Sequence, residues 1–149
     1  KPLNLESAVI GFRNFEGREG AYNKAGMRSF AVFLNHETAL DLQAQGWNVK
    51  FPKEHENADP DMGEKNPYLQ VTVAYENFPP NVFLISGNNP PTRLEEQEVA
   101  MLDWAELETV DLVIRPYTWS VNGKTGVKAY LKAGYFTIVT DQFQHKYGL

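Results

Sequence analysis

The sequence has no cysteine among its 149 residues, and this absence excludes several kinds of protein. Without thiols there is no disulfide framework, no cysteine-ligated zinc site and no thiol nucleophile. The three histidines, His36, His55 and His145, lie far apart and show no metal-ligand spacing. We therefore expect neither a metal centre nor a cofactor.

Long apolar runs are also missing. No stretch approaches the ~18 residues that cross a membrane, and no signal peptide is visible, so we expect an intracellular protein. The length suits a single domain over residues 1–149, which can bury a core without disulfides or metals. A start at Lys1 in place of methionine suggests that the ends of the chain have been trimmed.

The net charge of −5 is unusual for a protein that binds nucleic acid, but the acidic residues are concentrated. They gather in 53–65, which we interpret as an exposed acidic loop, and in 93–108. Outside these segments 8 of the 19 acidic and 11 of the 14 basic side chains remain. A local basic face is compatible with an acidic total.

Aromatic residues make up 13% of the chain, and many fall in segments typical of strands. The pattern predicts strands at 7–15, 27–34, 48–52, 67–76, 81–86, 109–121 and 124–139, with 67–76 and 81–86 forming a pair. It predicts one helix at 36–46, capped by Asn35, and another at 93–107, with Thr92 and Glu95 as a capping box. This mainly β pattern with one or two short helices favours an OB-fold-like five-stranded barrel with extensions. A β-sandwich is the alternative.

The last two predicted strands flank Asn122-Gly123, a pair typical of a tight type I′ turn. Whether the loop has two or four residues, odd positions of the first strand share a face with even positions of the second. One face is apolar and belongs in a core: Leu112, Ile114, Pro116, Thr118, Val127, Ala129, Leu131 and Ala133. The other face alternates aromatic and basic residues: Arg115, Tyr117, Trp119, Lys128, Tyr130 and Lys132.

The mixed face suits single-stranded nucleic acid, because unpaired bases stack on aromatic rings while Lys and Arg neutralise phosphates. Lys124, beside the turn, joins the predicted contacts. The competing interpretation places the rings in the core. A second cluster lies in and around the glycine-rich segment 16–26, which we interpret either as a flexible clamp over a bound strand or as an ordinary polar loop. Its members are Arg13, Phe15, Arg18, Tyr22, Asn23, Lys24 and Arg28.

Several runs resemble single-stranded DNA-binding proteins encoded by tailed bacteriophages. They are Arg13-Asn14-Phe15-Glu16-Gly17, Tyr22-Asn23, Gly26 with Arg28-x-Phe30, Leu102-Asp103-Trp104, and most of 110–130. The resemblance implies an OB-fold protein that coats single strands in the cytoplasm of the infected host. It assigns DNA contacts to Arg13, Phe15, Tyr22, Arg28, Arg115, Tyr117, Trp119, Lys128 and Tyr130. Many such proteins end in an acidic tail that recruits replication partners. This chain ends in Lys146-Tyr147-Gly148-Leu149, so either that tail was removed or partners are recruited differently.

These observations predict sequence-tolerant binding and protection of single-stranded DNA during phage replication or recombination, without catalysis. The expected partners are single-stranded DNA and replication or recombination proteins. The main alternative is a non-enzymatic oligomeric or virion component that uses the acidic helix and exposed aromatics as an interface. A metal-dependent nuclease is a third hypothesis, although no acid/base pair or nucleophilic triad is identifiable.

Overall fold

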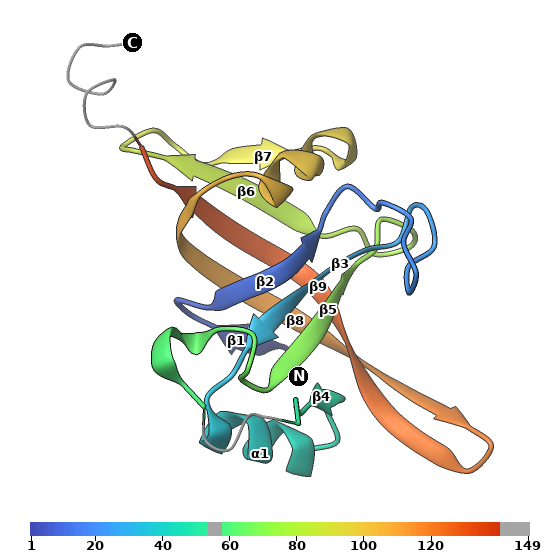
Figure 1. Cartoon of the computed structure of the whole chain (residues 1–149). Coiled ribbons are helices and arrows are strands. Elements are labelled where there is room, and N and C mark those ends of the chain that lie inside the picture. Colours follow the sequence, from blue (N-terminus) through green and yellow to red (C-terminus); the bar gives the residue numbers. More distant parts are fainter. Residues whose placement is uncertain (54–57, 141–149) are drawn as a thin grey trace.

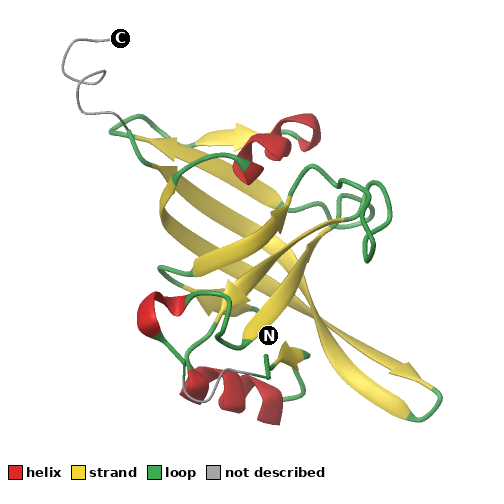
Figure 2. Ribbon diagram, viewed as in Figure 1, coloured by secondary structure: helices red, strands yellow, loops and turns green. Residues whose placement is uncertain are grey.

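The computed structural model describes residues 1–53 and 58–140, so the C-terminal tail and His55 lie outside the described residues. Strands wrap around one core, and short helices lie at two ends of the barrel (Figures 1 and 2). The strands are β1 (Leu3–Leu5), β2 (Val9–Asn14), β3 (Arg28–Phe33), β4 (Val49–Lys50), β5 (Tyr68–Val73), β6 (Asn81–Ser86), β7 (Thr92–Leu94), β8 (Leu107–Val121) and β9 (Lys124–Ile138). The helices are α1 (His36–Ala44) and the 3₁₀ segments η1 (Pro60–Met62), within the predicted acidic loop, and η2 (Glu96–Asp103).

The N-terminal segment closes the sheet into a barrel. The strands follow the order β1-β8-β9-β5-β3-β2, so two segments that are consecutive in the chain stand at opposite ends of the path. β1 pairs with β8, the amide of Ala8 donates to the carbonyl of Val110 at 2.8 Å, and β2 then pairs with β3. One sheet joined in this way is an OB-like barrel, as predicted, and not a two-sheet sandwich.

The longest feature is the hairpin of β8 and β9, which projects beyond the barrel (Figure 1). Asn122 and Gly123 have φ values of 51° and 79°, as a type I′ turn requires. The register pairs Val121 with Lys124 and Arg115 with Tyr130, which is the two-residue alternative. The predicted strands and turn of this hairpin are confirmed.

α1 also matches its prediction. The Asn35 side chain accepts a hydrogen bond from the Thr38 amide at 2.8 Å, and Gly46 ends the helix region with a φ of 97°. The Gly46 carbonyl then accepts from the amide of Val127 at 3.0 Å. The helix end therefore supports the projecting hairpin on its inner side.

The predicted pairing of 67–76 with 81–86 is wrong. β5 runs parallel to β9 at Val71 and Ala129, whereas β6 runs parallel to β9 further along, at Val82 and Gly134. β9 has 15 residues, so it is long enough to pair with β5 and then, further along, with β6. A hairpin was predicted because the two segments are close in sequence, but both instead pair with a distant strand.

The predicted helix at 93–107 is also partly wrong. Thr92–Leu94 is strand β7, which pairs with β6 and buries Leu94. The capping box lies three residues later than predicted, because the amide of Glu95 donates to the Glu98 side chain at 2.7 Å. The helical segment that follows, η2, is 3₁₀ and not α-helical.

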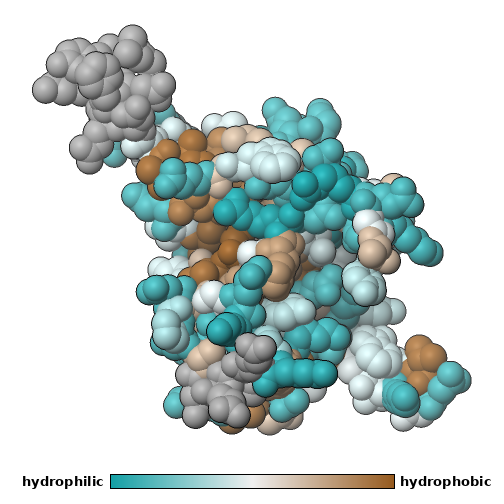
Figure 3. Space-filling view, viewed as in Figure 1, coloured by the Kyte–Doolittle hydropathy of each residue, from teal (hydrophilic) through white to brown (hydrophobic). Residues whose placement is uncertain are grey.

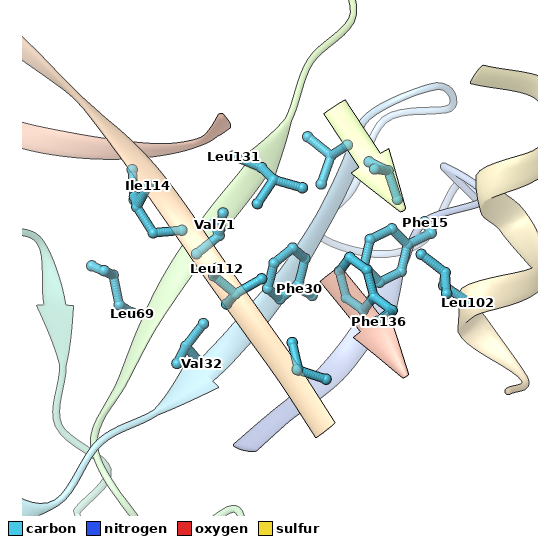
Figure 4. Packing of buried hydrophobic residues seen from close by; sticks show 14 of the residues in the cluster. Phe15, Phe30, Val32, Leu69, Val71, Leu102, Leu112, Ile114, Leu131 and Phe136 are labelled. Atoms are coloured by element: carbon cyan, nitrogen blue, oxygen red, sulfur yellow. The ribbon is translucent and has the colours of Figure 1, made fainter. Parts of the chain in front are cut away.

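The core is centred on three phenylalanines from distant parts of the chain (Figure 4). Phe15 stacks on Phe30 with ring centroids 5.1 Å apart, and Phe136 meets Phe15 edge-on at 5.7 Å. Leu102 of η2 packs beside them and is fully buried. η2 is therefore attached to the barrel through its apolar side.

The apolar face predicted for the hairpin is confirmed within the barrel, where Leu112, Ile114, Ala129 and Leu131 are buried. Nearer the turn, Pro116 and Val127 are half-buried, and the prediction is wrong for Thr118, which is exposed where the hairpin projects. The prediction is wrong for Ala133. Pairing shifts between Ile114–Leu131 and Val113–Ala133, so a bulge at Lys132 moves Ala133 to the opposite face. No helix in the described ranges is long and apolar enough to cross a membrane.

Candidate nucleic-acid interface

The outward face of the β8–β9 hairpin carries the aromatic and basic side chains that its parity predicts. Tyr117 is half exposed and meets Tyr130 edge-on, with ring centroids 6.0 Å apart. The Arg115 guanidinium lies 5.0 Å from the centroid of the Tyr130 ring, and Lys128 Nζ lies 5.3 Å from it. Rings and cations therefore stand in contact on the face away from the core.

Trp119 extends this face toward the hairpin tip. It pairs with Gly126, where a Cβ atom would lie 2.7 Å from the indole carbon Cζ2. The indole thus lies against the backbone of Gly126, in space that the side chain of any other residue at position 126 would occupy. A ring placed in this way is oriented before any ligand arrives, which lowers the entropic cost of stacking.

A second aromatic cluster, which the sequence did not predict, lies on the outer side of β2, β3 and β5. Phe12, Phe33 and Tyr68 contact each other edge-on, with centroid separations of 5.6, 5.5 and 6.2 Å. Phe12 is 51% exposed and has a φ of 46°, at a bulge between Gly11 and Asn14. A positive φ is rare for a bulky residue and is held here where the bulge turns the ring outward.

The two aromatic regions border one groove, which Trp119 and Tyr130 line on the hairpin side, while Tyr117 and Arg115 lie on the same face outside its cavities. A cavity of about 400 Å³ beside Phe12 and Tyr68 shares Asn23, Ser29 and Gln70 with a middle cavity of about 180 Å³ beside Trp119. The middle cavity shares Arg28 and Lys128 with a third, of about 260 Å³, beside Tyr130.

The groove therefore crosses the outer surface from β2 over β3 and β5 to β9 and β8. Figure 3 views the molecule from the side of β2, β3 and β5, and shows less polar side chains in the middle of this face among hydrophilic ones.

The glycine-rich segment 16–26 borders the groove and is organised by two amides. Asn23 Nδ2 donates to the carbonyls of Arg18, Lys24 and Met27 at 2.7, 3.1 and 3.0 Å. Asn14 Oδ1 accepts from the amides of Gly17 and Arg18 at 3.0 and 2.8 Å. Tyr22 projects fully exposed from this loop and lines the cavity beside Phe12.

The structure contradicts the predicted DNA contact of Phe15, whose side chain is 0% exposed in the core. Arg13 and Arg18 are directed to the η2 region. Arg13 Nη1 donates to the carbonyls of Leu102 and Ala105, both at 2.8 Å. The Arg18 guanidinium is 3.8 Å from Asp103 Oδ2 and 5.3 Å from the centroid of the Trp104 ring. In this structure both arginines attach neighbouring segments to each other.

The remaining predicted residues take different places. Arg28 lines two of the three cavities, so it lies on the groove. Lys24, Lys124 and Lys132 are exposed on the loop, beside the hairpin turn and at the β9 bulge, and do not line these cavities. The residues in ranges 1–53 and 58–140 include no group of three or more His, Asp or Glu that could hold a metal ion.

A family model described as "Putative phage ssDNA-binding domain" matches residues 1–149. The chain belongs to this family. The family is one of phage single-stranded DNA-binding domains, so the resemblance seen in the sequence is confirmed.

Solved structures of related fold include the single-stranded DNA-binding protein of bacteriophage Enc34. Its complex with ssDNA has a TM-score of 0.58 and 12% identity, covering 94% of this chain and 88% of that one. A C-terminally truncated form has a TM-score of 0.57 and 11% identity, covering 94% and 87%. At these identities the likeness shows the fold. No curated protein sequence matches the chain.

Proposed function

We propose that the chain is a single OB-like domain that holds single-stranded DNA in this groove, without catalysis and with little sequence preference. The observation that carries the proposal is the alternation of rings and cations on the outward face of β8 and β9. Bases stack on Tyr117, Trp119 and Tyr130, while Arg115 and Lys128 neutralise phosphates between them.

The opposite end of the groove supplies a second set of rings. Phe12, Tyr22 and Tyr68 line the largest of the three cavities. Neutral polar side chains, including Ser29, Gln70 and Thr72, line the middle. Stacking accepts any base, and rotatable hydroxyl and amide groups accept more than one pattern of base edges. The proposed strand therefore runs between two aromatic ends with little reading of sequence.

Charge is distributed to suit such a path. The chain has a net charge of −5, but residues 112–140 contain no Asp or Glu and include Arg115, Lys124, Lys128 and Lys132. This basic stretch forms the hairpin and its continuation. The association constant for oligo-dT should fall by about 0.7 log unit per log unit of salt for each phosphate contacted.

Titration of fluorescein-labelled oligo-dT at two salt concentrations tests the proposal. We expect binding that weakens with salt and quenches Trp119 fluorescence. Trp47 is buried and Trp104 is 73% exposed, so Trp104→Phe should retain the quenching and Trp119→Phe should lose most of it. An absence of binding at low salt would refute the proposal. Labelled oligo-U in the same titration measures the preference for DNA over RNA.

In the infected cell, this activity would protect exposed single strands in the host cytoplasm during replication and recombination, beside the proteins that carry out those processes. A protein contact is a second candidate role, favoured by the exposure of Trp104 and of Met101 on η2. Acidic residues surround these side chains in the sequence. Light scattering with and without oligo-dT separates the roles, because an interface of this kind predicts an oligomer that forms regardless of DNA.

A further inference from the structure

Two carboxylates, those of Glu76 and Glu96, line the third cavity of the groove beside two cations, and among the described residues only Glu96 forms an ion pair there. Arg28, Lys128, Tyr75, Tyr130 and Glu96 line the cavity of about 260 Å³ at the third position along the path. Glu96 Oε2 lies 3.2 Å from Arg28 Nη1, at hydrogen-bonding distance. A carboxylate and a phosphate accept the same hydrogen bonds from a guanidinium group. The position that Glu96 occupies is therefore a position suited to an anion.

The cationic partner is held in place, whereas the carboxylate is not. Arg28 Nε donates to the Phe15 carbonyl at 2.9 Å, and its guanidinium lies 5.5 Å from the centroid of the Tyr75 ring. The Arg28 side chain is only 19% exposed, but that of Glu96 is 52% exposed. Arg28 is thus directed at the cavity by buried contacts, and Glu96 can rotate into solvent.

Tyr75 provides an independent sign of a missing partner. Its hydroxyl is buried and has no hydrogen-bond partner among the described residues, although the side chain lines the same cavity. Burial raises the pKa of Tyr75 to about 12, so the hydroxyl remains a neutral donor at physiological pH. A buried donor without an acceptor is unfavourable, and an anionic oxygen would satisfy it.

We propose that this cavity binds one phosphate of single-stranded DNA and that the Glu96 carboxylate occupies the phosphate position when DNA is absent. The proposal rests on the proposed function and adds a defined contact to it. On binding, a phosphate oxygen replaces Glu96 Oε2 at Arg28, with Lys128 on the cavity wall, and Glu96 turns outward. A free anion that displaces Glu96 only replaces one ion pair with Arg28 by another. A DNA strand also gains stacking of its bases, so the Glu96 carboxylate selects for ligands that carry bases as well as phosphates.

The experiment compares Glu96→Gln with Glu106→Gln, using anisotropy of fluorescein-labelled oligo-dT over a range of salt. Both variants remove one negative charge from the same acidic segment, but Glu106 is exposed and lines none of the three groove cavities. Removing the competing carboxylate should tighten binding about two- to fivefold, the range of exposed ion pairs. It should also steepen the salt dependence by about 0.7 log unit per log unit, because Arg28 then exchanges a counterion for the phosphate. Glu106→Gln should remain close to the wild type.

A second comparison identifies the partner. In an Arg28→Lys background, which keeps the charge but loses the guanidinium, the gain from Glu96→Gln should shrink markedly. Thermal unfolding of each variant reports whether the loop anchored by Arg28 remains folded. Equal affinities for Glu96→Gln and Glu106→Gln would overturn the phosphate site while leaving the proposed function intact. Loss of oligo-dT binding by every protein, including the wild type, would instead refute the proposed function.

Discussion

Phe12 and Phe15 lie three residues apart, yet we expect their substitutions to have opposite consequences. Phe12→Ala should weaken DNA binding and leave the fold largely intact, because its ring lies 51% exposed beside the groove. Phe15→Ala should destabilise the fold, because its ring is 0% exposed. The two substitutions test whether the bulge in β2 places the Phe12 ring on the outer surface and the Phe15 ring in the core.

The loss expected for Phe15→Ala follows from its packing. The ring stacks on Phe30 at 5.1 Å and meets Phe136 at 5.7 Å, so truncation leaves a cavity in the centre of the core. Buried Phe→Ala substitutions cost about 3–5 kcal/mol of unfolding free energy. At roughly 2–4 °C per kcal/mol for a chain of this size, Tm should fall by about 6–20 °C.

The loss expected for Phe12→Ala is in affinity. One stacked base contributes about 1–3 kcal/mol, so the Kd for oligo-dT should rise roughly 5- to 150-fold. The fold loses only the edge contacts of Phe12 with Phe33 and Tyr68, each about 0.5–1.5 kcal/mol beyond burial. Tm should therefore fall by less than in Phe15→Ala.

Two measurements on each variant decide the matter: thermal unfolding by circular dichroism, and anisotropy with labelled oligo-dT well below the variant's Tm. Phe33→Leu serves as a control, since Phe33 is 5% exposed within the same outer cluster and an apolar side chain retained there should cost less stability than Phe15→Ala and less affinity than Phe12→Ala. The reasoning fails if Phe15→Ala keeps the wild-type Tm while losing affinity. It also fails if Phe12→Ala binds oligo-dT as well as the wild type.

Four further substitutions test separate parts of the structure. Trp119→Ala should raise the Kd for oligo-dT roughly 5- to 150-fold with a small change in Tm, measured by anisotropy and circular dichroism. Gly126→Ala should also weaken binding and shift tryptophan emission, because the new Cβ would lie 2.7 Å from the Trp119 ring. Arg13→Met should lower the unfolding free energy in urea by about 2–3 kcal/mol, since it leaves two carbonyls without a charged donor. Tyr75→Phe tests the raised pKa, which is about 12 in the folded protein against 10.0 normally. The folded state holds the Tyr75 proton more strongly than the unfolded state does. The contribution of this protonated hydroxyl to the free energy of unfolding is therefore complete below pH 10 and is lost as the pH rises toward 12. The wild type should therefore lose stability in this window more steeply than Tyr75→Phe.

The face assignment in β8 and β9 could be predicted because one local signal sets the register of the whole ribbon. Asn122-Gly123 favours a two-residue turn, and strict alternation then places Tyr117 and Lys128 on the same side. Near Lys132 a bulge interrupts the alternation and inverts the prediction for Ala133, and a second register shift lies further from the turn, between Leu107 and Thr109. The prediction is thus correct up to the first inserted residue.

Bulges and distant pairings explain what could not be predicted. The extra residue in β2 turns Phe12 outward, and nothing in the local composition marks its position. β5 and β6 have the composition of strands, but their common partner β9 begins about 40 residues beyond β6 and pairs with each of them in parallel. Local propensity shows that a segment is a strand and gives little information on the strand beside it.

Two of the runs that carry the family resemblance prove to contact each other. Asp103 accepts hydrogen bonds from the amides of Phe15 and Glu16 at 2.6 and 3.0 Å, and Arg13 donates to the carbonyl of Leu102. The run at 13–17 therefore holds η2 against the barrel in this chain, and its Phe15 side chain lies in the core.

This attachment also reaches the groove. The Phe15 carbonyl accepts a hydrogen bond from Arg28 Nε, and η2 carries Glu96. The junction between the 13–17 run and η2 therefore positions both the guanidinium and the carboxylate of the proposed phosphate site. Substitutions at the junction should consequently change stability and DNA affinity together. Substitutions at Phe12 or Trp119, on the open face of the groove, should act mainly on affinity.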